Sequence, residues 1–113
     1  MITVRFYQKP SNGSIHMTLK GHADSAPKGE DLVCSAATML AYTVAQVVRF
    51  MHENEQLKKK PKIHIKDGEA TIIATPTEDA YAEALHAFWV AQCGVHVLAH
   101  NFPQNVKLEH LTV

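Results

Sequence analysis

The sequence predicts an α+β domain in which a mainly antiparallel sheet carries two helices on one face, in the chain order β-β-α-β-β-α-β. The strand-like segments alternate apolar and polar residues, which is typical of an antiparallel sheet with one solvated face. Two longer segments repeat apolar residues at helical spacing. The length of 113 residues, 46% of them hydrophobic, fits one domain that spans residues 1–113.

Two alternating segments at the N-terminus predict a hairpin. They are separated by the turn-forming stretch Pro-Ser-Asn-Gly at 10–13. The apolar positions of the two strands are Ile2, Val4, Phe6, Ile15, Met17 and Leu19. Since alternate residues of a strand face opposite sides, one face of this hairpin is apolar.

A long helix is predicted from Leu32 to about Leu57. Its more polar positions step by three or four residues along one stripe. They are Ser35, Thr38, Tyr42, Gln46, Arg49 and Glu53. The apolar run Leu32–Met51 has the length of a membrane span, but the charge of Arg49 at that depth would be costly in lipid. We therefore interpret it as a largely buried helix of a domain and expect no membrane partner.

The second half of the chain repeats the pattern. Ile63 and Ile65 begin a strand, Asp67-Gly68 forms a turn, and 69–75 returns. Thr77 is the predicted N-cap of a second helix that ends at Asn101 and Pro103. The buried side of this helix is marked by Tyr81, Leu85, Phe88 and Val95, and a last strand follows at 106–111.

The charge balance excludes some classes of partner. Eleven Lys and Arg residues match eleven Asp and Glu residues, so no net charge attracts the chain to nucleic acid or to an anionic membrane. The lysines at 58–60 and Lys62 lack interleaved aromatic residues, and we interpret them as a solvated connection with no specific nucleic-acid partner, weak attraction to ribosomal RNA being the lesser alternative. The N-terminus shows no signal-peptide pattern, which predicts a cytoplasmic protein.

The stretch GHADSAPKGEDLVCSAATML at 21–40 contains the candidate catalytic residues. If Asp31 is the N-cap of the first helix, Cys34 lies in its first turn, where unpaired amides and the helix dipole stabilise a thiolate. His22, just past the second strand, could take the thiol proton and later protonate an amine leaving group. The free amides could stabilise an oxyanion. This combination suits acyl transfer through a cysteine nucleophile.

Spacing alone also permits a structural reading, in which Cys34 is an inert core residue and His22 a solvated loop residue. Asp31 then does no more than cap its helix. Gly21 and Gly29 bracket the loop between the strand and the helix. Residues 23–30 are small or polar, so we expect a mobile flap that closes over a bound peptide.

The motif resembles that of the ribosomal-processing cysteine proteases, the Prp family. The resemblance rests on Gly21-His22-Ala23, Gly29, Asp31, Val33-Cys34 and the hydroxyl residue Thr38. It implies that His22 and Cys34 are the catalytic pair and that Asp31, Gly21, Gly29 and Thr38 support the site. It also implies cleavage after aromatic residues, removing the N-terminal extension of large-subunit ribosomal protein twenty-seven.

Two positions depart from the family pattern. Ser35 stands where alanine is common, and Thr38 stands where serine is common. Thr38 keeps the hydroxyl one helical turn after Cys34, while its methyl group can alter the substrate pocket. The resemblance also implies a homodimer, which agrees with a first helix more apolar than one sheet face can cover.

Other polar residues are weaker candidates. His96 and His100 have the spacing of two helical zinc ligands, but a third ligand is lacking, so we expect no metal and no cofactor. Cys93 is interpreted as a small core residue. We assign no role to the histidines at positions 16, 64 and 110.

Two functions of different classes therefore remain. The leading one is a cysteine endopeptidase that acts on an extended peptide through Cys34 and His22. The alternative is a non-catalytic module that binds a ribosomal or other protein, with both residues structural.

Overall fold

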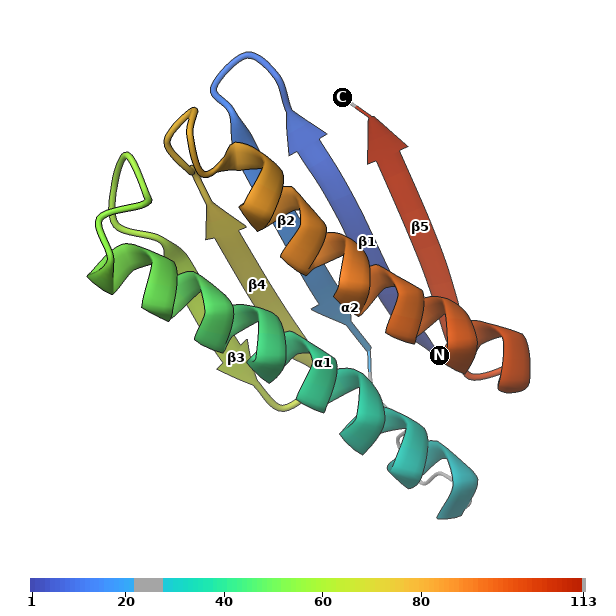
Figure 1. The fold of residues 1–113 in the computed structure, drawn as a ribbon. Coiled ribbons are helices and arrows are strands. Elements are labelled where there is room, and N and C mark those ends of the chain that lie inside the picture. Colours follow the sequence, from blue (N-terminus) through green and yellow to red (C-terminus); the bar gives the residue numbers. More distant parts are fainter. Residues whose placement is uncertain (22–27, 113) are drawn as a thin grey trace.

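The computed structural model describes residues 1–21 and 28–112. The elements follow the predicted order (Figure 1). They are β1 (Ile2–Lys9), β2 (Ser14–Lys20), α1 (Lys28–Glu53), β3 (Lys62–Lys66), β4 (Glu69–Ala74), α2 (Tyr81–Asn101) and β5 (Val106–Thr112). The predicted α+β class is confirmed.

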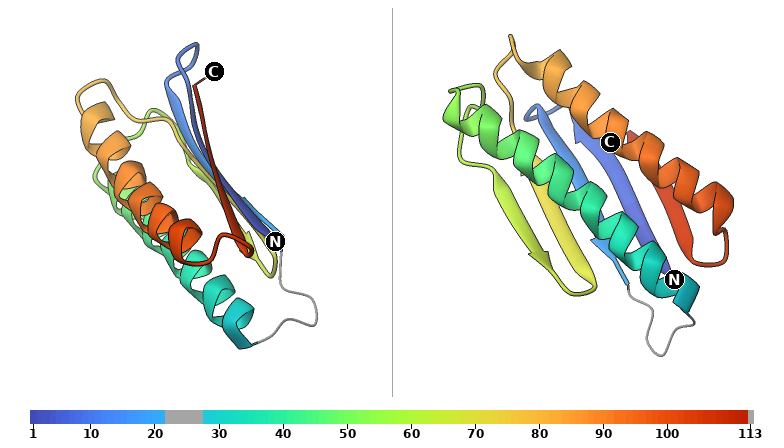
Figure 2. Two further views of the ribbon diagram at one scale, coloured as in Figure 1. Left: turned by 90° about the vertical axis from the view of Figure 1, so that its right-hand side faces the viewer. Right: turned by 60° about the horizontal axis from the view of Figure 1, so that its bottom comes forward.

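The five strands form one sheet in the order β3-β4-β2-β1-β5. All neighbours are antiparallel except β1 and β5, which run parallel, so the expectation of a mainly antiparallel sheet is confirmed. The segments β2-α1-β3 and β4-α2-β5 are crossover connections between parallel strands. Both helices lie on the same face of the sheet, and the opposite face carries none of the described helices (Figure 2).

Strand alternation separates the two faces of the sheet. The helix-covered face of the two central strands carries the six apolar residues predicted for the first hairpin, each at most 5% exposed. These residues pack against the inner sides of the helices to form the core. The buried side of α1 consists of Val33, Ala37, Ala41, Val44, Ala45, Val48 and Met51.

The first helix ends at Glu53, four residues before the predicted end at Leu57. The amide of Gln56 donates to the carbonyl of Met51 at 2.9 Å, and the amide of Glu55 donates to that of His52 at 3.2 Å. This is the Schellman arrangement, with Glu55 at φ 60° in the position that glycine usually occupies. The sequence does not reveal this end because no glycine marks it.

The second helix begins at Tyr81, so the predicted N-cap at Thr77 is wrong. The amide of Thr77 donates to the carbonyl of Gln56 at 2.9 Å, which ties this residue to the connection that follows α1. A separate turn then leads to Ala80, which occupies the N-cap position without a capping side chain. The predicted end at Asn101 is confirmed. The buried residues are Ala84, Phe88, Ala91 and Val95, while Tyr81 and Leu85 are only partly buried.

One segment of α1, Leu32–Glu53, is long and apolar enough to cross a membrane by length and composition alone. One side of this segment forms the core against the sheet, which accounts for that part of its apolar character. The opposite side exposes Leu32, Met39, Tyr42 and Phe50.

Candidate active site

Gly21 directly follows β2 and precedes His22 in the chain. Its φ is +110°, and a Cβ built on it would lie 2.2 Å from the carbonyl oxygen of Met1. Its amide donates to the carbonyl of Gly68 in the β3–β4 turn at 2.9 Å. Both the backbone angle and the close approach therefore require glycine at this position. The motif glycine has a structural reason that spacing alone did not provide.

Cys34 lies near the N-terminal end of α1, at the border of its buried side. The preceding residue, Val33, is 1% exposed, whereas Cys34 is partly buried and packs against the core. Thr38, one turn later on the same side of the helix, is likewise partly buried, and Ser35 is exposed. The sulfur is thus a free thiol that solvent reaches in part.

The start of α1 differs from the prediction. The helix begins at Lys28, so Asp31 is inside its first turn and is not the N-cap, and Cys34 is the seventh helical residue. The sequence left this undecided because Asp is favoured at both places. The amides without a helical partner belong to 28–31, about one turn before Cys34. Cys34 therefore lies beyond the first turn, where the effect of the helix dipole has fallen off.

His22 lies outside the described residues, and so does the side chain of Asp31. The structure therefore does not test the pairing of His22 with Cys34 or the role of Asp31. The predicted flap at 23–30 is wrong in its last part, because 28–30 belong to α1. Its remaining residues are outside the described part of the chain.

The C-terminal half of α2 lies beside the N-terminal half of α1, since the two helices run antiparallel (Figure 1). The two helices approach closely at Gly94, where a Cβ would lie 2.9 Å from a methyl group of Leu40. Cys34 is therefore held on a helix that is packed both on the sheet and on a second helix. Such a position limits the movement of a nucleophile.

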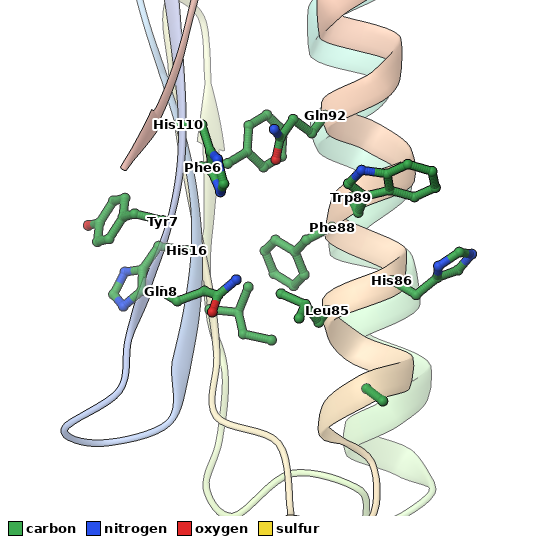
Figure 3. A pocket seen from close by; sticks show the side chains of 12 residues that line it. Phe6, Tyr7, Gln8, His16, Leu85, His86, Phe88, Trp89, Gln92 and His110 are labelled. Carbon is green, nitrogen blue, oxygen red and sulfur yellow. The ribbon is translucent and has the colours of Figure 1, made fainter. Parts of the chain in front are cut away.

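An apolar cavity of about 330 Å³ lies at the other end of the sheet, between α2 and the strands β1, β2 and β5. Figure 3 shows the side chains of Phe6, Leu85 and Phe88 between the sheet and the helix. Trp89, which is 54% exposed, and His110 also line the cavity. None of the motif residues that the structure describes lines it, so the cavity is a feature separate from Gly21 and Cys34. Sequence reasoning did not find this cavity.

A second nucleophile and histidine meet on the helix-free side of the sheet. The hydroxyl of Ser14 lies 2.7 Å from Nε2 of His16 and donates to Oδ1 of Asn12 at 2.6 Å. With its single proton given to Asn12, Ser14 accepts a hydrogen bond from Nε2–H, which leaves Nδ1 of His16 buried without a partner among the described residues. The His16 ring also stacks on Tyr7, with the ring centres 4.3 Å apart.

The chemistry of this second pair argues against catalysis. Ser14 and His16 are 2% and 4% exposed, and the histidine does not accept the serine proton. Burial, and secondarily the charge of Lys9, lowers the pKa of His16 below its usual value of 6.5. We interpret the pair as structural.

Cys93 is exposed on α2, so its interpretation as a core residue is wrong. The helical spacing placed it beside the buried Val95 but did not indicate which way it faces. His96 and His100 are exposed on the same helix. Within residues 1–21 and 28–112, no three His, Cys, Asp or Glu side chains are grouped as metal ligands would be.

Comparison with known proteins identifies the family. The family model described as cysteine protease Prp matches residues 1–107. No curated protein matches the chain.

Solved structures share the fold at low sequence identity. A structure of the essential ribosomal processing protease Prp from S. aureus, in complex with a covalently linked product peptide, is 20% identical. The alignment covers 98% of this chain and 100% of that one, with a TM-score of 0.71. The protein SMU.848 from Streptococcus mutans is 23% identical, with a TM-score of 0.70 and coverage of 100% and 96%. Because the family model spans nearly the whole chain, the protein belongs to the Prp family of cysteine proteases.

Proposed function

We propose that this protein is a cysteine endopeptidase that removes the N-terminal extension of large-subunit ribosomal protein twenty-seven by cleavage after aromatic residues. The observation that carries the proposal is the match to the cysteine protease Prp family over residues 1–107, which includes the whole motif from Gly21 to Thr38. Prp from S. aureus, described as a ribosomal processing protease, has been solved with a substrate peptide and with a covalently linked product peptide.

In the proposed reaction, His22 takes the proton of Cys34 and the thiolate attacks the scissile carbonyl carbon. The resulting tetrahedral intermediate collapses with cleavage of the C–N bond, and the imidazolium gives its proton to the departing amine. A thioester then links the N-terminal product to Cys34. His22 next takes a proton from water, whose oxygen attacks the thioester carbonyl and releases the acid and the thiol.

The described residues hold the chain in place directly before His22 and at Cys34. Gly21, the residue before His22, is held by its hydrogen bond to Gly68 and by the contact with Met1. Cys34 is partly exposed on a helix whose neighbouring residues Val33 and Ala37 are fully buried. Residues 22–33 separate these two points, and 28–33 of them belong to α1. A rigid support on both sides favours a reproducible approach of imidazole to sulfur.

The test is mass spectrometry of the purified protein after incubation with the extended ribosomal protein from the same genome. We expect one cut after an aromatic residue by the unaltered protein and by Cys93→Ser, and no cut by Cys34→Ala. Cys93 is the matched control because it is the other cysteine and is exposed. Cleavage by purified Cys34→Ala would refute the mechanism, and an uncut substrate with the unaltered protein would refute the activity.

We further propose a homodimer through the outer side of α1. Leu32, Met39 and Phe50 are 71%, 63% and 55% exposed, and an apolar hollow lies between Met39 and Phe50. A symmetric pair would bury this row of side chains, which is costly to leave in water. Light scattering should give twice the chain mass, and Met39→Glu with Phe50→Glu should give one chain mass. A single chain mass for the unaltered protein at micromolar concentration would contradict the dimer.

A further inference from the structure

The helix-free face of the sheet collects positive charge although the whole chain is neutral. Among the described residues, six Lys and Arg side chains project from this face, but only two Asp and Glu side chains do. The cations are Arg5, Lys9, Lys20, Lys62, Lys66 and Lys107, and the acids are Glu69 and Glu109. This segregation is not visible in the sequence, because the cations are scattered along the chain and lie close together only when the strands pair.

The pairing register brings three of these lysines into one row across the sheet. Lys66 pairs with Glu69, which pairs with Lys20, and Lys20 pairs with Thr3, which pairs with Lys107. Adjacent strands lie about 4.8 Å apart, so a lysine occurs about every 10 Å along a row of about 19 Å. Lys66 and Lys107 have side chains 61% and 62% exposed. We call Lys20, Lys66 and Lys107 the lysine row.

A polar hollow of about 380 Å³ adjoins the lysine row on the same face. Its lining includes the hydroxyl residues Thr3, Thr18 and Thr71, with Arg5 and Lys20 beside them. Lysine ammonium and threonine hydroxyl groups are the side-chain donors that proteins use for phosphate oxygens. A hydroxyl can also exchange hydrogen bonds with the 2′-hydroxyl of ribose, which DNA lacks.

The two acids on the face do not neutralise it. Glu109 is shared between Arg5 at 2.6 Å and Lys107 at 3.3 Å, and Glu69 lies 3.4 Å from Lys66. Such exposed ion pairs contribute little stability, so a phosphate can replace the carboxylate as partner. Charge complementarity therefore favours a polyanion on this face. The apolar side chains that line the hollow, Leu19 and Ala70, are buried, so they offer little surface for a lipid.

We propose that the lysine row and the adjoining hollow bind the sugar-phosphate backbone of an RNA strand without reading its sequence. The lysines contact phosphates, and the threonine hydroxyls contact phosphate or ribose oxygens. This inference does not depend on the protease reaction. It concerns the face of the sheet opposite to α1, the helix that carries Cys34.

The test uses Cys34→Ala protein, so that its result stands whether or not the protein is a protease. Fluorescence anisotropy measures binding of a labelled uridine-rich RNA of about 20 nucleotides at several salt concentrations. Replacement of the lysine row by glutamine should weaken binding roughly tenfold or more and reduce the salt slope by about 2, since each single-strand phosphate contact contributes about 0.7. Glu69→Gln with Glu109→Gln should tighten binding.

The matched control replaces the three lysines at 58–60 by glutamine, which changes the net charge by the same amount outside the lysine row. This variant should lose much less affinity. Equal loss in both triple variants would overturn the assignment to this face, and so would an absence of RNA binding. Equal binding of DNA of the same sequence, of polyglutamate or of phosphatidylserine vesicles would overturn the choice of RNA.

Discussion

The two ends of the sheet each carry a nucleophilic side chain, but the surroundings of the two differ. At one end Cys34 stands partly exposed on α1, and His22, its proposed partner, lies outside the described residues. At the other end Ser14 and His16 lie 2.7 Å apart, yet both are buried and the serine proton goes to Asn12. Hydrogen-bond distance between a nucleophile and a histidine does not make a catalytic pair. Access for a substrate and the direction of the proton are also needed.

The largest expected effect is a difference in catalytic activity between variants of His22 and variants of His16. His22→Ala should lower kcat/KM for the extended substrate by at least about a thousandfold, because the thiol loses its base and the leaving amine its acid. His16→Gln, corrected for the fraction of folded protein, should leave kcat/KM nearly unchanged. Steady-state kinetics on both variants checks this. Comparable losses in the two variants would show that the distinction between the two ends is mistaken.

Gly21 and Gly13 provide a second contrast, because both have positive φ but only Gly21 is crowded. Gly13→Ala has open space around the new methyl group and should cost about 1–2 kcal/mol for the backbone conformation alone. Gly21→Ala should cost more, since the methyl group also collides with the carbonyl of Met1, and it should reduce kcat by moving His22. Urea unfolding and kinetics measure the two effects. If both variants behave alike, the close approach at Gly21 is unimportant.

A smaller effect concerns the pH dependence of stability. Burial lowers the pKa of His16 in the folded protein, whereas the unfolded chain keeps the usual value of about 6.5. Unfolding therefore takes up a proton at acidic pH, and the contribution of His16 to stability is complete above about pH 6.5 and lost as the pH falls toward the lowered pKa.

The measurement is the free energy of unfolding at about pH 8 and about pH 5. The difference between the two values should shrink in His16→Gln and persist in His64→Gln, which alters an exposed histidine of the same sheet face. An unchanged difference in His16→Gln would show that this histidine is not the acid-sensitive group.

The sequence predicted the fold well because alternation and helical spacing report which side of each element is buried. The sequence-based prediction was wrong at helix ends whose position depends on backbone hydrogen bonds. These are the Schellman end of α1 at Glu55, the start of α2, and the start of α1 ahead of Asp31. The orientation of Cys93 was missed for another reason. The exposed apolar residues Trp89, Val90 and Val97 interrupt the polar residues on the outer side of α2, so the sequence does not show that Cys93 faces outward.

The candidate site was predictable only in part. His22 and Cys34 followed from the motif, and the structure added the physical reason for Gly21. The sequence did not predict the cavity near Trp89 or its distance from the motif. The reason is that the cavity depends on how α2 lies across β1 and β5. The same holds for the lysine row, which requires the register of all five strands.

The central claim is that His22 activates Cys34, and thiol alkylation tests it most directly. In Cys93→Ser protein, Cys34 is the only cysteine, so the rate of modification by iodoacetamide at neutral pH reports its thiolate. We expect Cys34 to react at least about tenfold faster than the same cysteine in the unfolded chain, and His22→Ala to remove this advantage. A Cys34 that reacts no faster than the unfolded thiol, or that keeps its rate in His22→Ala, would contradict the catalytic pair.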